Sequence, residues 1–142
     1  MHIRALRKQD IPAALKILKE NYPHTPLYVR RARHELGAMF EPGVVIPHYI
    51  VAIESKKLIG FAGICPSWMD YGFSTLFWVN VDPRFQGAGI GTKMIKLLMR
   101  QAKKHKMKYI LLTTTRPAFY RHLGFRTLMP TSKTYKLMIG TV

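Results

Sequence analysis

Residues 78–92, WVNVDPRFQGAGIGT, place three kinds of local structure in a fixed order. An apolar, β-branched run ends at Asp82-Pro83, a turn with three glycines follows, and an amphipathic segment begins directly after it. This is the order strand, glycine-rich loop, helix. Such a loop leaves backbone N–H groups without partners at the positive end of a helix dipole, and its glycines let an anion approach the backbone. The segment therefore predicts a phosphate-binding loop.

Three known kinds of phosphate-binding loop can be compared with it. A Walker loop needs Lys-Ser or Lys-Thr after its last glycine, whereas Gly91 is followed by Thr92-Lys93. A dinucleotide loop needs G-x-G-x-x-G, whereas this chain has G-x-G-x-G. The third pattern, Q/R-x-x-G-x-G/A behind Val-x-Pro, is matched by residues 81–91. It resembles the acetyl-CoA pyrophosphate loop of the GNAT superfamily of N-acetyltransferases. Taken alone, the loop is also compatible with a tight connection whose glycines serve only geometry.

A second motif supports the resemblance. The sequence PAFYRHLGF, residues 117–125, follows a strand-like run at 109–115. Pro117 suits the first turn of a helix, and Gly124 suits the left-handed residue that ends it. This segment resembles the late F-Y-x-x-x-G-F motif of the same family. Two motifs in the right order are more specific than either one, and the resemblance covers residues 73–127.

The rest of the chain follows the layout of that family. Helical spacing of apolar residues is expected after Asp10, which can cap the helix, over 27–40 and from residue 90 onward. Strand-like runs are 3–6, 49–53, 58–64, 73–81, 109–115, 125–129 and 134–139. The order β-α-α-β-β-β-α-β-α-β-β predicts an α/β (α+β) fold of the GNAT-like three-layer type. Its twisted mixed sheet has about seven strands with helices on both faces, and residues 1–142 form a single domain.

Composition sets limits on the class of protein. The chain has 142 residues, 48% of them hydrophobic, which is enough for one domain with a hydrophobic core. No apolar run reaches about 18 residues, so a membrane-spanning helix is not expected. The N-terminus is too polar for a signal peptide. Cys65 is the single cysteine, which excludes an intramolecular disulfide and a cysteine-based metal site. We expect a cytoplasmic protein without a metal.

The resemblance implies which residues bind acetyl-CoA. In the family, the strand before the glycine loop splays away from the strand after the long helix, and the pantetheine arm lies between them. The backbone of Val79 and Val81 would pair with that arm, and the loop would hold the pyrophosphate. The family usually has an Asn after the later strand, where this chain has Thr115-Arg116. The expected cofactor-binding residues are Val79, Asn80, Val81, Gln86, Gly87, Ala88, Gly89, Ile90, Gly91, Thr92, Thr115 and Phe119.

The resemblance also implies a catalytic acid. Tyr120 matches the tyrosine that the family places near the sulfur of CoA, where a phenol can protonate the departing thiolate. The general base is not assigned. The chain has only seven acidic residues, and none of them lies within the two motif strands. Asp70 and Glu35 are the carboxylates that could reach an acceptor, and His34 is a further candidate.

The net charge of +16 is the main indication of the substrate. A field of this size attracts anions and repels polyamines and aminoglycosides. We therefore expect an acetyl-CoA-dependent N-acetyltransferase acting on a small primary amine that also carries an anionic group, by direct transfer in a ternary complex. Arg30 and Arg31 are the candidate anchors for that group. The alternative is a basic RNA- or ribosome-associated module on the same fold, including one that acetylates a protein N-terminus or lysine. Both motifs favour the enzyme, as a monomer or homodimer without membrane contact.

Overall fold

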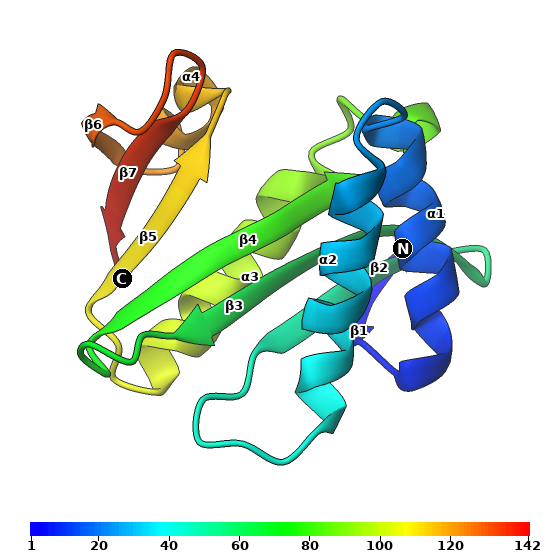
Figure 1. The fold of residues 1–142 in the computed structure, drawn as a ribbon, viewed down its shortest axis with the longest axis horizontal. Helices are drawn as coiled ribbons and strands as arrows, with labels where there is room; N and C mark the ends of the chain where they lie inside the picture. The colour runs from blue at the N-terminus through cyan, green and yellow to red at the C-terminus, as the bar shows by residue number, and fades with distance from the viewer.

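The computed structural model of residues 1–142 contains one seven-stranded sheet with the strand order β1-β2-β3-β4-β5-β7-β6 (Figure 1). The strands are β1 (His2–Ala5), β2 (His48–Glu54), β3 (Lys57–Pro66), β4 (Phe73–Val81), β5 (Tyr109–Thr114), β6 (Arg126–Pro130) and β7 (Lys136–Thr141). The helices are α1 (Ile11–Asn21), α2 (Pro26–Gly37), α3 (Ile90–Lys104) and α4 (Pro117–Arg121). The element order and the α/β class predicted from the sequence are confirmed.

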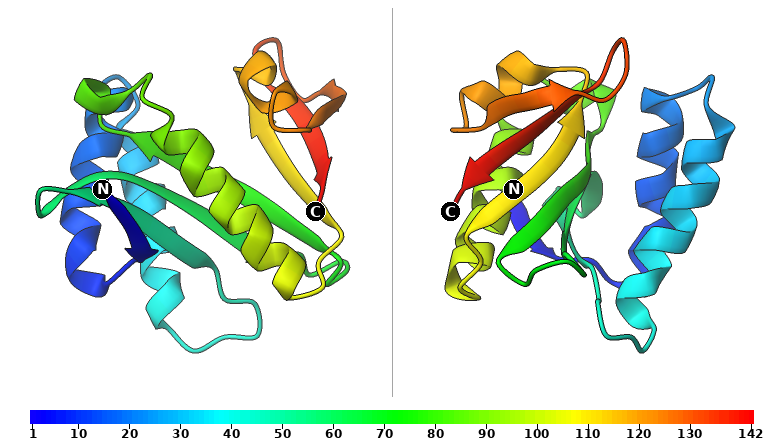
Figure 2. Two further views of the ribbon diagram at one scale, coloured as in Figure 1. Left: turned by 180° about the vertical axis from the view of Figure 1, so that it is seen from behind. Right: turned by 60° about the vertical axis from the view of Figure 1, so that its left-hand side comes forward.

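Helices cover both faces of the sheet (Figure 2). α1 and α2 pack on one face, over a core that includes Leu18, Leu36 and Phe61. α3 packs on the other face, where Met94 and Leu98 are fully buried. The spacing of four between these two residues places them on the same side of the helix. None of the helices combines the length and apolar character that crossing a bilayer requires.

The start of α1 differs from the expected arrangement. Asp10 occupies the N-cap position of α1 but makes no side-chain capping bond to that helix. Its carboxylate instead accepts hydrogen bonds from the Arg7 N–H at 2.7 Å and from the Arg4 guanidinium at 2.7 and 3.0 Å. The Asp10 carboxylate therefore connects β1 to the turn between β1 and α1. It bonds to the charged Arg4 side chain and to the Arg7 amide, and not to an amide of α1.

β4 and β5 are parallel, but they pair over three residues only, from Phe73–Tyr109 to Thr75–Leu111. Beyond that point the strands diverge, so β5, β7, β6 and α4 form a separate wing of the sheet (Figure 1). The divergence coincides with an irregularity in β4. Trp78 has φ of +52°, and the β3–β4 register shifts between Phe61 and Gly63. A bulge of this kind bends its strand and increases its twist, which separates β4 from β5.

Candidate active site

The diverging strands enclose a cavity of about 1750 Å³. Its walls come from β4, β5, α2, α4 and the glycine loop at residues 86–91. The hydrogen bond between the hydroxyls of Tyr28 and Tyr135, at 3.3 Å, links α2 to the segment before β7. The helix on one side of the cavity is therefore connected to the β5–β7 side across it.

The glycine loop presents unpaired donors to this cavity. No backbone N–H from Gln86 to Thr92 donates to a backbone or side-chain acceptor, and the first bond after the loop runs from Lys93 N–H to Gly89 C=O. Gly87 and Gly89 have φ of +82° and +79°, which L side chains rarely adopt. These glycines are needed for backbone conformation, which turns consecutive N–H groups outward at the positive end of α3.

The structure brings the expected cofactor residues together with one exception. All of them except Ala88 line the cavity, as does Tyr120. The side chains of Asn80 and Gln86, however, already have partners. Asn21 donates to the Asn80 Oδ1 atom at 2.9 Å, and Gln86 donates to the Asn21 Oδ1 atom at 3.1 Å. These two side chains brace the loop against α1 through the Asn80 Oδ1 and Gln86 Nε2 atoms.

Asn21 was not identified from the sequence, because nothing in the sequence marks an Asn at the end of a helix as the partner of a loop 65 residues away. Both Asn21 and Gln86 donate to the carbonyl of Val81, at 3.1 Å each. Asn80 pairs with β3, and the Asp82 N–H bonds to the Ile59 carbonyl, also in β3. Backbone groups of successive residues in a strand point to alternate sides. Asn80 and Asp82 face β3, so the Val81 N–H points away from β3, toward the cavity.

The end of β4 is fixed by an ion pair. Asp82 is 1% exposed, and its carboxylate accepts from Arg84 at 2.6 Å (Nη2), 2.9 Å (Nε) and 3.0 Å (backbone N). The hydrogen bonds from Arg84 lower the pKa of Asp82 to about 2 despite its burial. Arg84 is thereby held in the turn, where the Asp82 carboxylate offsets its charge.

Tyr120 lies on the α4 side of the cavity, packed edge-on against Phe119 and Phe125. Burial, with a smaller contribution from Tyr22, raises the pKa of Tyr120 to about 12. The phenol therefore keeps its proton at neutral pH. A protonated phenol in an apolar setting can donate to a developing thiolate, which is the role that the family resemblance implies.

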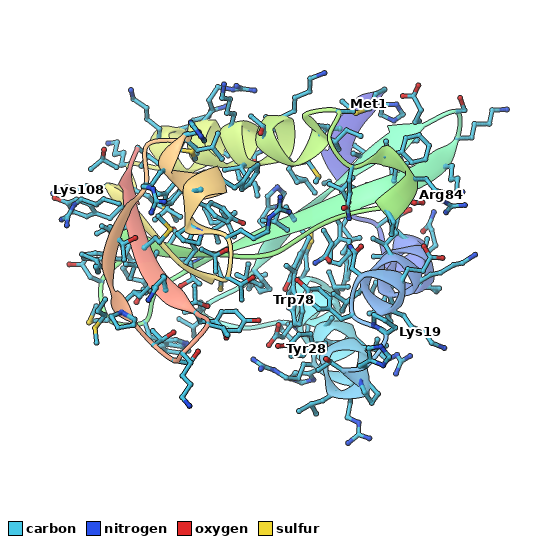
Figure 3. The ribbon with its side chains drawn as sticks, turned by 90° about the horizontal axis from the view of Figure 1, so that it is seen from above. Met1, Lys19, Tyr28, Trp78, Arg84 and Lys108 are labelled. Atoms are coloured by element: carbon cyan, nitrogen blue, oxygen red, sulfur yellow. The ribbon has the colours of Figure 1, made fainter.

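Glu35 is the one carboxylate among the residues that line the cavity. Its Oε2 atom accepts a hydrogen bond from the indole N–H of Trp78, and its Oε1 atom lies 3.5 Å from a guanidinium nitrogen of Arg31. The Trp78 ring also packs edge-on against Tyr28 of α2, beside which it lies in Figure 3. The unusual backbone of Trp78 thus positions a side chain that holds the carboxylate at the β4 side of α2.

Tyr49 adds a polar group to the same region. The residue is fully buried and lines the cavity, yet its hydroxyl has no hydrogen-bond partner. Burial, followed by the charge of Glu35 and by Cys65, raises the pKa of Tyr49. A buried hydroxyl without a partner is costly, which suggests a place for a ligand group or a water molecule. A Cβ on Gly63 would lie 2.4 Å from the Tyr49 ring, so the glycine at this position is the sequence feature that marks the close approach of the ring.

Of the other candidate residues, some line the cavity and some do not. Arg31, Glu35 and His34 line the cavity, whereas Arg30 and Asp70 do not. Asp70 accepts from the Gly72 N–H at 2.6 Å, as a turn residue. Arg31 is therefore the member of the arginine pair that can meet an acceptor, and its role remains a prediction.

Comparison with curated proteins identifies relatives of the central part of the chain. The chain is 37% identical over 75 residues to histone acetyltransferase TAP1 of Glycine max, a match that covers 51% of this chain and 31% of the relative. It is also 35% identical over 74 residues to the uncharacterized N-acetyltransferase ycf52 of Porphyra purpurea, covering 50% and 41%. The matches thus span less than half the length of either relative.

Comparison with solved structures identifies the same fold over the whole chain. The PaiA N-acetyltransferase of Thermoplasma acidophilum, in complex with coenzyme A, has a TM-score of 0.81 at 17% identity and covers 99% of this chain and 98% of its own. The aminoglycoside 6'-N-acetyltransferase of Enterococcus faecium has a TM-score of 0.80 at 17% identity, and the match covers 99% of this chain and 97% of that protein. The ribosomal-protein-S18-alanine N-acetyltransferase of Escherichia coli has a TM-score of 0.76 at 20% identity, and the match covers 99% of this chain and 93% of that protein.

The family comparison covers the glycine loop, the long helix and the tyrosine motif together. The model of the acetyltransferase (GNAT) domain matches residues 46–127, which is more than half of the chain. The matched region begins before β2 and ends in β6, so it includes the glycine loop and the cavity walls from β4, β5 and α4, whereas the lining residues of α1, α2 and β7 lie outside it. This chain belongs to the GNAT family of acetyl-CoA-dependent acetyltransferases.

Proposed function

We propose that this chain transfers an acetyl group from acetyl-CoA to a primary amine within its central cavity. The observation that carries the proposal is the run of unpaired N–H groups from Gln86 to Thr92, which opens into the cavity that also contains Tyr120 and Glu35. The N–H groups suit a pyrophosphate, and the diverging strands leave a path from the loop to the acceptor region. The transfer is direct, in a ternary complex of enzyme, acetyl-CoA and amine.

The residues divide the reaction between two sides of the cavity. The neutral amine nitrogen attacks the thioester carbon, and the Val81 N–H stabilises the oxygen that becomes negative. Collapse of the tetrahedral intermediate breaks the C–S bond, and Tyr120 donates a proton to the departing thiolate. Glu35 is our candidate for binding the amine and accepting its proton, either directly or through a water molecule held by Tyr49. The products are the N-acetylated amine and CoA.

The acceptor is proposed to be a small primary amine that carries an anionic group. Glu35 suits the amine, and Arg31, 3.5 Å away, suits a carboxylate or phosphate on the same molecule. Such an acceptor would replace the Arg31–Glu35 contact by two contacts of its own. A polycationic acceptor is disfavoured by the net charge of +16.

The experiment is a turnover screen that follows thiol release. Amino acids and phosphorylated amines form one set, aminoglycosides a second, and peptides with free N-termini a third. We expect turnover in the first set. Turnover confined to the peptides would support acetylation of a protein N-terminus, and turnover confined to aminoglycosides would contradict the anionic-acceptor proposal.

Replacement of Glu35 tests the acceptor side. Glu35→Gln preserves the shape of the side chain and removes its charge, so turnover is expected to fall by about 10²-fold or more, as for loss of a catalytic base. CoA affinity should be unchanged. Glu41→Gln, on an exposed residue outside the cavity, is the matched control. Equal turnover in the two variants would remove Glu35 from the mechanism.

A further inference from the structure

The outer face of α3 is cationic over its whole length. Lys93, Lys96, Arg100, Lys103 and Lys104 are all exposed, and their spacing of three, four, three and one places them on one side of the helix, opposite the buried Met94 and Leu98. We call these five residues the cationic face. The helix of 15 residues contains no Asp or Glu, and none of the ion pairs in the structure involves it. At about 1.5 Å per residue, α3 is about 22 Å long.

The positive charge continues past the helix. Lys106 and Lys108, in the turn before β5, are exposed as well. The N–H groups of Lys108 and Tyr109 both donate to the Gly72 carbonyl, at 2.8 and 3.0 Å. This turn is therefore fastened to the β3–β4 loop, residues 67–72, and the two segments form one end of the molecule.

The β3–β4 loop carries large apolar side chains in water. Trp68 and Tyr71 are 79% and 70% exposed, and we call these two residues the aromatic tip; Met69 between them is 77% exposed. Next to the tip, Phe73 and Tyr109 stack with ring centroids 5.1 Å apart, and Tyr109 is itself 37% exposed. Exposed aromatic side chains that gather beside cations are uncommon on a surface without a partner.

The ordinary explanation accounts for only part of this surface. Cations in the last turn of a helix are stabilised by its dipole, and this explains Lys103 and Lys104. Lys93 lies in the first turn, where the dipole is unfavourable to a cation, and Arg100 lies between the two ends. Helix electrostatics also gives no reason for Trp68 and Tyr71 to be exposed.

We propose that the cationic face and the aromatic tip together bind single-stranded nucleic acid. The phosphates follow the cationic face, and bases stack on Trp68 and Tyr71, which is the combination used by proteins that bind single strands without sequence readout. A membrane surface fits less well, because inserting the tip would bury the Asp70 carboxylate together with its apolar neighbours. Stacking leaves that carboxylate in water, where it accepts from the Gly72 N–H.

Apart from Lys93, which directly follows the glycine loop, the proposed surface is separate from the acetyl-transfer site. Lys108 lies at one end of the molecule, and Arg84, which precedes the glycine loop, lies at the other (Figure 3). None of Lys96, Arg100, Lys103, Trp68 or Tyr71 lines the cavity. Nucleic acid and acetyl-CoA are therefore expected to bind at the same time, and the two proposals can fail independently.

The test measures fluorescence anisotropy of labelled oligouridine and oligothymidine of about 20 nucleotides, with a duplex of equal length for comparison. The charge variant is Lys96→Glu/Arg100→Glu/Lys103→Glu, and its control is Lys8→Glu/Lys16→Glu/Lys19→Glu. The control changes the net charge equally, through exposed residues of the N-terminal part. We expect the charge variant to weaken single-strand binding by about tenfold more than the control, with a smaller dependence on salt.

The stacking variant is Trp68→Ala/Tyr71→Ala. It is expected to weaken single-strand binding by at least about fivefold without changing the salt dependence, and to leave duplex binding unaffected. CoA binding should be the same in all variants, which also reports that they are folded. If a charge reversal prevents folding, the corresponding Gln substitutions at the same three positions replace it.

Three outcomes would overturn the proposal. Equal losses in the charge variant and its control would show that only net charge matters. Unchanged affinity in the stacking variant would remove the aromatic tip from the site. Tighter binding to phosphatidylserine vesicles than to the oligonucleotides, lost in the stacking variant, would identify a membrane surface instead. Different affinities for oligouridine and oligothymidine, with both variants behaving as expected, would support the proposal and identify the preferred strand.

Discussion

The two ends of α3 both face outward as positive surfaces, but they are built differently. At its beginning, the positive groups are backbone N–H groups from Gln86 to Thr92, fixed by Gly87 and Gly89 and braced through Asn21. At its end they are lysine side chains, each flexible and exposed. The first kind of site is specific in shape, because the donors cannot move apart. The second is specific mainly in charge, so it accepts any polyanion that follows its length and weakens with salt.

The comparison teaches that net charge alone says little about where an anion binds. The +16 charge is spread along the chain, whereas the glycine loop that we propose for the pyrophosphate contains no cation between Gln86 and Thr92. The nearest arginine, Arg84, is held by Asp82. The loop therefore depends on backbone geometry, and substitutions that change shape should affect it more than substitutions that change charge elsewhere.

The largest expected effect follows from filling the loop. Gly89→Glu places a carboxylate among the unpaired N–H groups and forces an L side chain into φ of +79°. CoA affinity, measured by calorimetry, is expected to fall by at least about 10²-fold, given repulsion of the pyrophosphate and loss of the donors. Gly43→Glu, in the exposed segment before β2, adds the same charge without entering the cavity and should bind CoA as the wild type does. Equal CoA binding by Gly89→Glu and Gly43→Glu would mean that the loop is not the pyrophosphate site.

The sequence was sufficient to locate this end of α3. The glycine spacing predicted the loop, and the run 73–81 predicted β4 with its observed bounds. These features are local, since strand, turn and helix preferences act over a few residues. The sequence could not predict the acceptor side in the same way. Glu35 and Trp78 meet across 43 positions, and their contact depends on the backbone irregularity at Trp78, which no local pattern indicates.

The candidates for the general base show the same limit of local sequence patterns. Asp70, Glu35 and His34 could not be separated from the sequence, because which of them faces the cavity depends on the fold and not on their neighbours in the chain. The fold separates Asp70 from the other two by turning it toward Gly72. Tyr49 lies in a strand of apolar residues and is fully buried, yet its hydroxyl has no partner and the residue lines the cavity.

A smaller effect distinguishes chemistry from binding. Tyr120→Phe keeps the ring between Phe119 and Phe125 and removes the proton donor. Turnover at saturating substrates is expected to fall by about 10²-fold, while CoA affinity stays within about twofold. Because the pKa of Tyr120 is raised to about 12, the donor remains protonated up to that pH, and the loss should be the same at pH 7 and pH 9. A loss that disappears toward pH 9 would indicate that another group is the acid, and unchanged turnover would leave Tyr120 a packing residue.

The smallest effect concerns what holds the loop in place. Asp82→Asn keeps an oxygen that can accept from the Arg84 N–H but removes the charged pair, so the free energy of unfolding should fall by about 1–3 kcal/mol at neutral pH, as for loss of a hydrogen bond to a charged group. The pKa of Asp82 is lowered from its ordinary 3.8 to about 2 in the folded protein. Its contribution is therefore fully present above pH 4 and is lost as the pH falls from 4 to 2. Denaturant unfolding of both proteins should show their difference in stability shrinking over that interval, while the Arg4–Asp10 pair, common to both, cancels. A difference that stays constant from pH 7 to pH 2 would show that the ion pair does not stabilise the turn, and the rigidity of the loop would then have to come from Asn21 and Gln86.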